Sequence, residues 1–397
     1  MNWKVVLAIL SCNIVFMSAS YTMLIPFLPM YLIRELGVDP ASVNIWSGVV
    51  FSATFAVSAV MAPIWGRLSD KKGKKLMAIR ASLLLSISYF LGGIVTTPMQ
   101  LVFMRMFQGF AAGLWPMELA IMTLYAPRQK MGICLGIMQG VMTAGGIIGP
   151  LFGGILAELF GMRMSFYLAS AALFLNCLVF IFVIKEPPEE DVSAKPIKNK
   201  SAENAQGLLK IPLLRNMLIY AAFVQMVILI LQPILTTYIS SMAQHIDKLV
   251  LVSGLVFSLS GFASAISAPL WGRFGQHNGF FTSFSWALIT AGICMIFQAL
   301  PNNLYLFAAS QFVVGLFFAG INPSINAILA ENTDSHTRGR IFGLMFSAQQ
   351  IGAMVGPILG GIIATFIGIK FVFIVSGVIL IAISLISRKH RREYVQI

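Results

Sequence analysis

Residues 62–75 read APIWGRLSDKKGKK, and residues 268–281 read APLWGRFGQHNGFF. The shared pattern APxWGRxxxxxG returns after 206 positions, 268 minus 62, without the acid and the lysines of the first copy. A second pair of segments repeats at an offset of 207: GPLFGGILAELFGMRMSF begins at Gly149 and GPILGGIIATFIGIKFVF begins at Gly356. The chain is therefore predicted to contain two similar halves. In both copies of the motif we expect a Trp-Gly turn, followed in the first copy by a charged loop.

The composition is that of a membrane protein. Hydrophobic residues make up 58% of the 397 positions and charged residues 10%, and the mean hydropathy is +0.86. In soluble domains about a quarter of the residues are charged. Crossing ~30 Å of hydrocarbon takes about 20 apolar residues per helix. The sequence predicts twelve such spans, at 4–33, 43–66, 77–97, 100–125, 130–158, 163–184, 212–240, 249–271, 281–300, 303–330, 339–366 and 369–387.

The formal charge of +13 follows the predicted topology. With the amino terminus inside, 22 of the 27 lysines and arginines fall on the cytoplasmic side, while Arg34, Arg163, Lys248 and Lys370 fall outside and Arg105 lies within a span. The positive-inside rule produces this asymmetry. We therefore expect a multi-pass protein of the cytoplasmic (inner) cell membrane with both termini in the cytoplasm, and no nucleic-acid partner.

One long polar segment, KEPPEEDVSAKPIKNKSAENAQGLLK at 185–210, divides the chain. It is rich in Pro, Glu and Lys and poor in aromatic residues, which is typical of a linker. The predicted domains are a six-helix half at 1–184, a cytoplasmic linker at 185–211, a second six-helix half at 212–387 and a basic cytoplasmic tail at 388–397.

The sequence contains no recognisable catalytic or metal-binding pattern. The four histidines fall in predicted loops or in the tail, and the four cysteines share no C-x-x-C spacing. The motifs H-E-x-x-H, G-x-S-x-G and Walker A are absent. We therefore predict no enzyme activity, no metal or other cofactor, and no self-powered ATP transport.

Three motifs resemble those of a known family. The segment after the second span matches the family pattern G-x-L-x-D-x-x-G-[RK]-[RK] with Gly66, Leu68, Asp70, Gly73, Lys74 and Lys75. The fourth span matches L-x-x-x-R-x-x-Q-G with Leu101, Arg105, Gln108 and Gly109, and the fifth matches G-x-x-x-G-P-x-x-G-G with Gly145, Gly149, Pro150, Gly153 and Gly154. On these residues the chain resembles the twelve-helix drug:proton antiporters of the major facilitator superfamily, and most of all their multidrug exporters.

The resemblance implies a fold and a gate. The fold would be all-α and membrane-integral, the major facilitator fold, with twelve transmembrane helices in two pseudo-symmetric six-helix halves and a substrate path between them. The implied cytoplasmic gate motif comprises Gly66, Arg67, Asp70, Gly73, Lys74, Lys75 and Arg340. In it, Asp70 would accept backbone N–H groups at the start of the eleventh helix, near Arg340. One latch suffices for one gate, which would explain why the second copy of the motif lost its charges.

Glycines form a stripe on the fifth span. Gly145, Gly149 and Gly153 recur every fourth residue, so another backbone can approach that face closely. Helix packing alone would explain the stripe. The resemblance implies in addition a smooth seam that lets the two halves rock and prevents leakage, as in exporters. The predicted direction of transport rests on that likeness.

Arg105 and Glu118 are the ionisable residues that lie well inside predicted spans, where charge is costly enough to make them functional candidates. They are separated by ~20 Å along one helix, too far for a direct pair. At ~100° per residue, Gln108, Trp115, Glu118 and Met122 share an arc of about 80°, which we expect to face a central cavity. Desolvation disfavours an ionised carboxylate, so Glu118 is our candidate for proton coupling. The competing explanations are a structural glutamate that is hydrogen-bonded to neighbouring helices, and a counter-charge that selects cationic substrates.

The leading prediction is a proton-coupled efflux transporter that exports amphipathic or hydrophobic drugs by alternating access. The alternatives are an exporter of one specific metabolite, such as a siderophore or a sugar derivative, and a non-transporting receptor with the same fold. The expected partners are a small-molecule substrate, protons and the lipid bilayer, and we expect a monomer. Further candidates for the cavity lining are Tyr21, Gln225, Gln232, Asn322 and Asn326.

Overall fold

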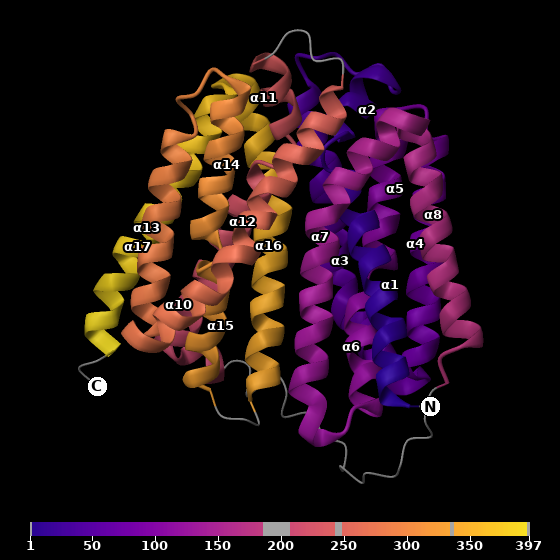
Figure 1. Ribbon diagram of the computed structural model, residues 1–397, viewed down its shortest axis with the longest axis vertical. Helices are drawn as coiled ribbons and strands as arrows, with labels where there is room; N and C mark the ends of the chain where they lie inside the picture. The colour runs from indigo at the N-terminus through magenta and orange to yellow at the C-terminus, as the bar shows by residue number, and fades with distance from the viewer. Residues whose placement is uncertain (1, 186–206, 243–247, 334–336, 395–397) are drawn as a thin grey trace. The chain divides into compact units, whose positions relative to one another are not determined.

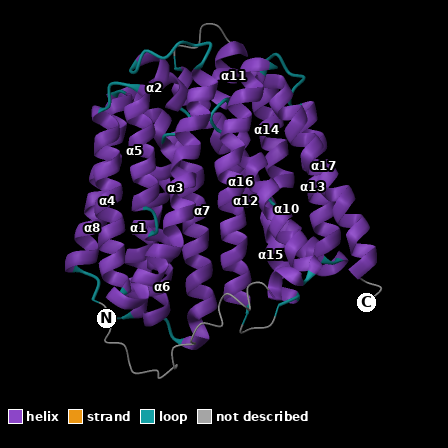
Figure 2. Cartoon of the chain, turned by 180° about the vertical axis from the view of Figure 1, so that it is seen from behind, coloured by secondary structure: helices purple, strands orange, loops and turns teal. Residues whose placement is uncertain are grey.

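The computed structural model describes residues 2–185, 207–242, 248–333 and 337–394. Within these residues every regular element is a helix, and Figure 2 shows helices and connecting loops with no strand among them. The prediction of an all-α protein is confirmed. Most of the predicted linker and the end of the basic tail lie outside the described residues.

The chain forms two compact units. The first comprises Met1–Glu190, Leu235–Ser240 and His245–Ser258, and the second comprises Asp191–Ile234, Ser241–Gln244 and Leu259–Ile397. Two short stretches beyond the predicted linker therefore belong to the first unit by their contacts.

The first unit is built from nine helical segments that precede the linker (Figure 1). They are α1 (Trp3–Met23), α2 (Leu28–Arg34), α3 (Val43–Lys72), α4 (Lys74–Ile94), α5 (Pro98–Ala111), α6 (Leu114–Tyr125), the 3-10 helix η1 (Arg128–Lys130), α7 (Met131–Phe160) and α8 (Met162–Phe182). Most of α11 (Leu235–Met242) and the first turns of α12 (Leu249–Asn278) also lie in this unit. The main helix pairs are α1 with α7, α4 with α8, and α3 with α5.

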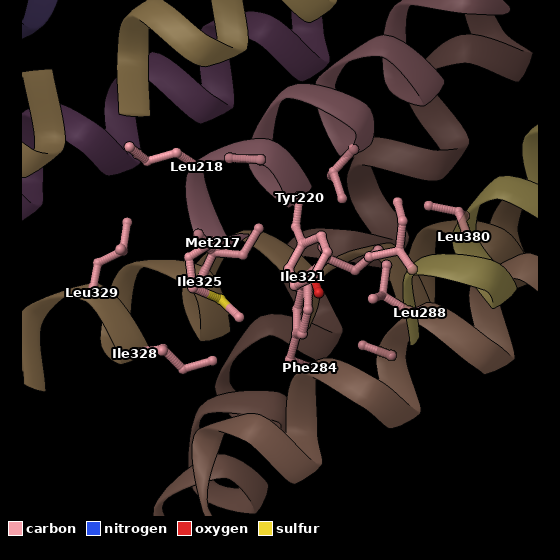
Figure 3. Packing of buried hydrophobic residues seen from close by; sticks show 14 of the residues in the cluster. Met217, Leu218, Tyr220, Phe284, Leu288, Ile321, Ile325, Ile328, Leu329 and Leu380 are labelled. Carbon is pink, nitrogen blue, oxygen red and sulfur yellow. The ribbon is translucent and has the colours of Figure 1, made fainter. Parts of the chain in front are cut away.

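The second unit repeats this pairing. Besides the rest of α12 it contains α10 (Pro212–Ile230), α13 (Phe280–Phe297), α14 (Leu304–Phe318), α15 (Ile321–Glu331), α16 (Arg338–Phe366) and α17 (Ile369–Tyr394). Here α10 packs on α16 and α13 on α17. Figure 3 shows its core, where the rings of Tyr220 and Phe284 lie 6.1 Å apart among Leu288, Ile321 and Ile325.

The described residues contain eleven helical runs that are long and apolar enough to cross a membrane, against the twelve spans predicted. The predicted spans 4–33, 212–240 and 303–330 are each interrupted, between α1 and α2, between α10 and α11, and between α14 and α15. The difference in number lies at 100–125. The sequence predicts one continuous helix there, and this prediction is wrong, because α5 ends at Ala111 and α6 begins at Leu114. Each piece is too short to count as a span by itself.

The predicted Trp-Gly turns are also wrong. Gly66 lies within α3, which continues to Lys72 and ends at Gly73, whose φ is +88°. The second copy behaves alike, since Gly272 lies within α12 and the positive φ of +84° falls on Gly279. A left-handed backbone is open to glycine at little cost, so the later glycine of the motif ends the helix and the earlier one does not.

The glycine stripe of α7 packs against α1. A β-carbon at Gly149 would lie 2.7 Å from the carbonyl oxygen of Ala19, and one at Gly153 would collide with the carbonyl oxygen of Met23. The second unit repeats the contact 207 positions later, where a β-carbon at Gly356 would lie 2.5 Å from the carbonyl oxygen of Met226 on α10. Gly352, Gly356 and Gly360 form the matching stripe on α16, so both stripes serve close packing inside a unit.

We expect Gly153→Ala to destabilise the protein by about 1–3 kcal/mol, because the added methyl group has no room beside α1. The matched control is Gly136→Ala on the same helix, where a β-carbon would meet nothing within 4 Å. The thermal midpoint (Tm) of the detergent-purified variants measures the effect. A similar Tm for both variants would contradict the packing account.

Candidate functional site

The chain between α5 and α6 leaves the helical path at Ala112 and Gly113. Gly113 has a φ of +117°, in the left-handed region. A break of this kind leaves carbonyl groups at the end of α5 without their helical partners. Inside a membrane each such group needs a donor from the protein, because no water is present to bond it.

Trp65 and Arg80, from α3 and α4, supply these donors. The indole Nε1 of Trp65 donates to the carbonyl oxygen of Phe110 at 2.8 Å. The guanidinium of Arg80 donates to the carbonyl oxygens of Ala112 at 3.1 Å and Phe110 at 3.5 Å, and lies 3.8 Å from the centre of the Trp65 ring. We call Trp65 and Arg80 the capping pair. Sequence reasoning missed it, although the repeated Trp of APxWGR was a signal.

The second unit has the same indole bond without the arginine. Trp271 donates to the carbonyl oxygen of Leu316 at 2.8 Å, at the end of α14. Both partners stand 206 positions after Trp65 and Phe110. Ser267 adds a hydroxyl bond of 2.8 Å to the same carbonyl. The repeated part of the motif therefore caps a helix end in each unit, which is a structural reason for its repetition.

The gate motif is described only in part. Gly66 and Arg67 lie in the last turns of α3, and Gly73 separates α3 from α4. Lys75 donates to the carbonyl oxygen of Ile181 at 3.1 Å, in addition to other interactions. The side chain of Asp70 lies outside the described part of the structure. Its contact near Arg340 stays a prediction, and so does the reason inferred for the lost charges.

Glu118 lies on the buried face of α6. Its side chain has 0% exposure, and both carboxyl oxygens are without a hydrogen-bond partner among the described residues. The same face carries Leu114, Met117, Ile121 and Met122, and α6 packs against α1, α4 and α7. An isolated ionised carboxylate is very costly in such surroundings. A neutral carboxyl group fits these surroundings, whereas an ionised one needs water or a counter-charge beside it.

Arg105 forms a second buried site on α5, with 3% exposure. Its Nη1 donates to Oε1 of Gln108 at 2.9 Å, while Nε and Nη2 are unpartnered within the described residues. The guanidinium lies 5.5 Å from the centre of the Phe51 ring. Tyr21 and Tyr89 are close enough to interact with it electrostatically. Four helices, α1, α3, α4 and α5, thus surround a cation with free donors.

The structure groups the predicted cavity residues differently from the arc that the sequence predicts. That arc assumes one continuous helix over 100–125, and the break at Gly113 interrupts this helix. Arg105, Gln108 and Tyr21 gather on one side of the break, and Glu118 and Met122 lie beyond it. Trp115 is half-buried against the same apolar cluster as Met122. In the second unit the predicted residues are half-buried or exposed: Gln225, Gln232, Asn322 and Asn326. That any of them faces a cavity stays a prediction.

The motif of α7 has a second packing face. Gly154 lies against α12, where a β-carbon would be 3.0 Å from the carbonyl oxygen of Val250. The carbonyl oxygen of Pro150 is pressed against Gly254, and the hydroxyl of Ser258 donates to the carbonyl oxygen of Ile147 at 2.7 Å. Pro150 and Gly154 therefore contact the first turns of α12, whereas the glycine stripe contacts α1.

Replacing Arg105 and replacing Arg80 should affect the thermal stability of the protein differently. We expect Arg105→Met to leave the Tm of the purified protein unchanged or to raise it by up to about 3 °C, because two of its nitrogens are desolvated without partners. We expect Arg80→Met to lower the Tm by at least about 3 °C, because two carbonyl groups lose a donor. Scanning fluorimetry compares them, and an equal loss in both variants would refute this view of Arg105.

Comparison with known proteins points to one family. A profile of the Major Facilitator Superfamily matches residues 10–279 and 234–394. The multidrug resistance protein MdtG of Proteus mirabilis (strain HI4320) is 33% identical over 377 residues, which cover 94% of this chain and 92% of that protein. The protein of the same name from Klebsiella pneumoniae (strain 342) is 32% identical over 385 residues, covering 96% and 92%. The resemblance inferred from the three motifs is confirmed.

Solved structures show the same fold at low identity. A bacterial homologue of the human lysosomal transporter Spinster, in an inward-facing and occupied conformation, has a TM-score of 0.83 at 15% identity, covering 98% of this chain and 97% of that one. The nucleoside transporter NupG has a TM-score of 0.79 at 17% identity, covering 98% and 99%. The expected major facilitator fold is confirmed.

Proposed function

We propose that this chain, which belongs to the Major Facilitator Superfamily, is a proton-coupled antiporter that exports amphipathic or hydrophobic compounds by alternating access. Membership makes it a multi-pass membrane transport protein and not an enzyme. Multidrug export is supported by relatives named multidrug resistance protein that align over nearly the full length. The charge asymmetry of the sequence supports a cytoplasmic membrane location with both termini inside. The proposal takes the monomer as the working unit.

The observation that carries proton coupling is the isolation of Glu118. A carboxyl group with 0% exposure and no partner among the described residues is compatible with its apolar face when it is neutral. Loss of the proton creates a charge that this face does not compensate. Ionisation therefore requires water, or a cationic substrate group, to reach α6. A site that changes protonation when access changes is what exchange of substrate against protons requires.

In the proposed cycle, the Glu118 carboxylate takes up a proton when the site opens to the outside, and the substrate leaves. The neutral site then reorients, and Glu118 releases its proton to the cytoplasm when a new substrate binds. Each turn moves a proton inward and a substrate outward, so the proton gradient drives export. The Arg105 cluster would bind polar groups of the substrate through its free N–H donors.

A second candidate is the export of one specific metabolite that carries an acidic group. Arg105 favours it, because two nitrogens of a buried guanidinium are without partners in the described structure and fit a carboxylate or phosphate oxygen. The two candidates differ in substrate and share the proton step. A substrate screen that finds transport of one acid and of no cationic dye would favour the second.

Proteoliposomes with an acidic lumen test the leading proposal. We expect the wild-type protein to accumulate ethidium only while the pH difference lasts. Glu118→Gln should lower gradient-driven uptake at least about tenfold and keep dye binding, because glutamine fills the same space but carries no titratable proton. Uptake of the dye by fluorescence and binding by equilibrium dialysis give the two measurements.

Glu158→Gln is the matched control, since Glu158 is an exposed acid on α7. It should transport normally. Normal transport by Glu118→Gln would exclude Glu118 as the coupling residue. Failure of the wild type to move any dye under any gradient would reject multidrug export.

A further inference from the structure

The short helix α6 places Glu118 close to the break in the chain. It has twelve residues, and Glu118 lies five positions after Gly113, a little more than one turn. A change of φ or ψ at Gly113 turns the whole of α6 by a comparable angle, so the backbone angles of this residue set the direction of the Glu118 side chain. The contacts that hold the break therefore decide what surrounds this carboxyl group.

Those contacts come from the capping pair. Arg80 bonds the carbonyl oxygen of Ala112, the residue directly before Gly113. Trp65 bonds Phe110 and supports the guanidinium of Arg80 with its ring. Arg80 belongs to α4, which also packs along α6. One helix thus holds the break and forms a wall of the face on which Glu118 lies.

The second unit shows what the break looks like without a buried acid. Trp271 makes the same indole bond, but no arginine accompanies it among the described contacts, and Gly320 keeps a right-handed φ of −81°. The buried face of the following helix, α15, carries Ile321, Ser324, Ile325, Ile328 and Leu329 and no carboxyl group. Among the described residues, a capping guanidinium and a left-handed glycine are found at the break that precedes Glu118 and not at the break that precedes α15.

We propose that Arg80, supported by Trp65, is a positioning residue for Glu118: it fixes the direction in which α6 leaves the break and keeps the carboxyl group on its dry, apolar face. This inference rests on the proposed role of Glu118 as the proton carrier. When the capping pair is weakened, α6 gains rotational freedom and water reaches the carboxyl group. Glu118 then ionises more readily than in the intact protein.

Carbodiimide labelling reports on this directly, because the reagent dicyclohexylcarbodiimide is apolar and reacts with protonated carboxyl groups. The purified full-length protein is labelled across a range of pH, and modification of Glu118 is followed by peptide mass spectrometry. Two variants weaken the capping pair. Trp65→Phe removes the indole N–H donor and keeps an aromatic ring, and Arg80→Lys keeps the positive charge and removes the planar guanidinium that bonds two carbonyl groups. The matched control is Trp271→Phe, which removes an indole bond of the same 2.8 Å length.

We expect Trp65→Phe and Arg80→Lys to slow labelling of Glu118 at pH 7 about three- to tenfold and to move the midpoint of its pH profile to lower pH. Trp271→Phe should label like the wild type. The two Trp variants should have a similar Tm, because each loses one hydrogen bond, so a general loss of stability would not produce the difference.

The outcomes separate the two proposals. Wild-type-like labelling in Trp65→Phe and Arg80→Lys would overturn the positioning role and leave the proton role of Glu118 intact. Equal slowing in Trp65→Phe and Trp271→Phe would overturn it too, since the effect would not depend on the break before Glu118. A wild type whose Glu118 is not labelled at any pH would overturn both proposals.

Discussion

In the hydrocarbon core of a membrane, water is not available to bond a free backbone carbonyl, so a spanning helix is broken only where the protein supplies a donor. Trp65 and Trp271 supply it in the two units, each through an indole N–H to a carbonyl at a helix end. The indole suits this task because it is apolar except for one N–H. These bonds allow the chain to break before the short helices α6 and α15.

Close backbone approach is the second constraint on the architecture. The glycine stripes of α7 and α16 let the backbones of α1 and α10 lie directly against them, at positions 207 apart. Such contacts gain dispersion energy without any hydrophobic driving force, since lipid is as apolar as the helix surface. The α7 motif contains glycine on a second face as well, because Gly154 packs against α12, as does the backbone of Pro150.

Several buried polar side chains have atoms without a described partner, and among them Arg105 and Glu118 stand out because they can carry a full charge. Their polar atoms are buried, and most of them have no partner among the described residues. A buried group that is left unbonded lowers stability, so a function that needs the free group is the natural reason for its presence. The two lie on either side of the break that Trp65 and Arg80 cap. Two of the three guanidinium nitrogens of Arg80 donate to carbonyl groups, whereas two of the three of Arg105 have no described partner.

Much of the molecule follows from local properties of the sequence. Long apolar runs predict membrane helices, the repeats at 206 and 207 positions predict two related halves, and lone charges in apolar runs single out Arg105 and Glu118. These features hold whatever the helices pack against. The family also follows from motifs that can be read directly along the chain, such as the one that begins at Gly145.

The break at Ala112 and Gly113 is weakly marked in FAAGLWP, because the run is apolar and a single glycine is tolerated within a helix; Pro116, in the first turn of α6, is its sequence signal. Its donors come from positions 45 and 32 residues away in the chain. The direction of the glycine stripe, toward α1, and the absence of a described partner for Glu118 are likewise relations between distant segments. Hydrophobic periodicity is a local property, whereas hydrogen-bond partners and packing neighbours exist only once the helices have assembled.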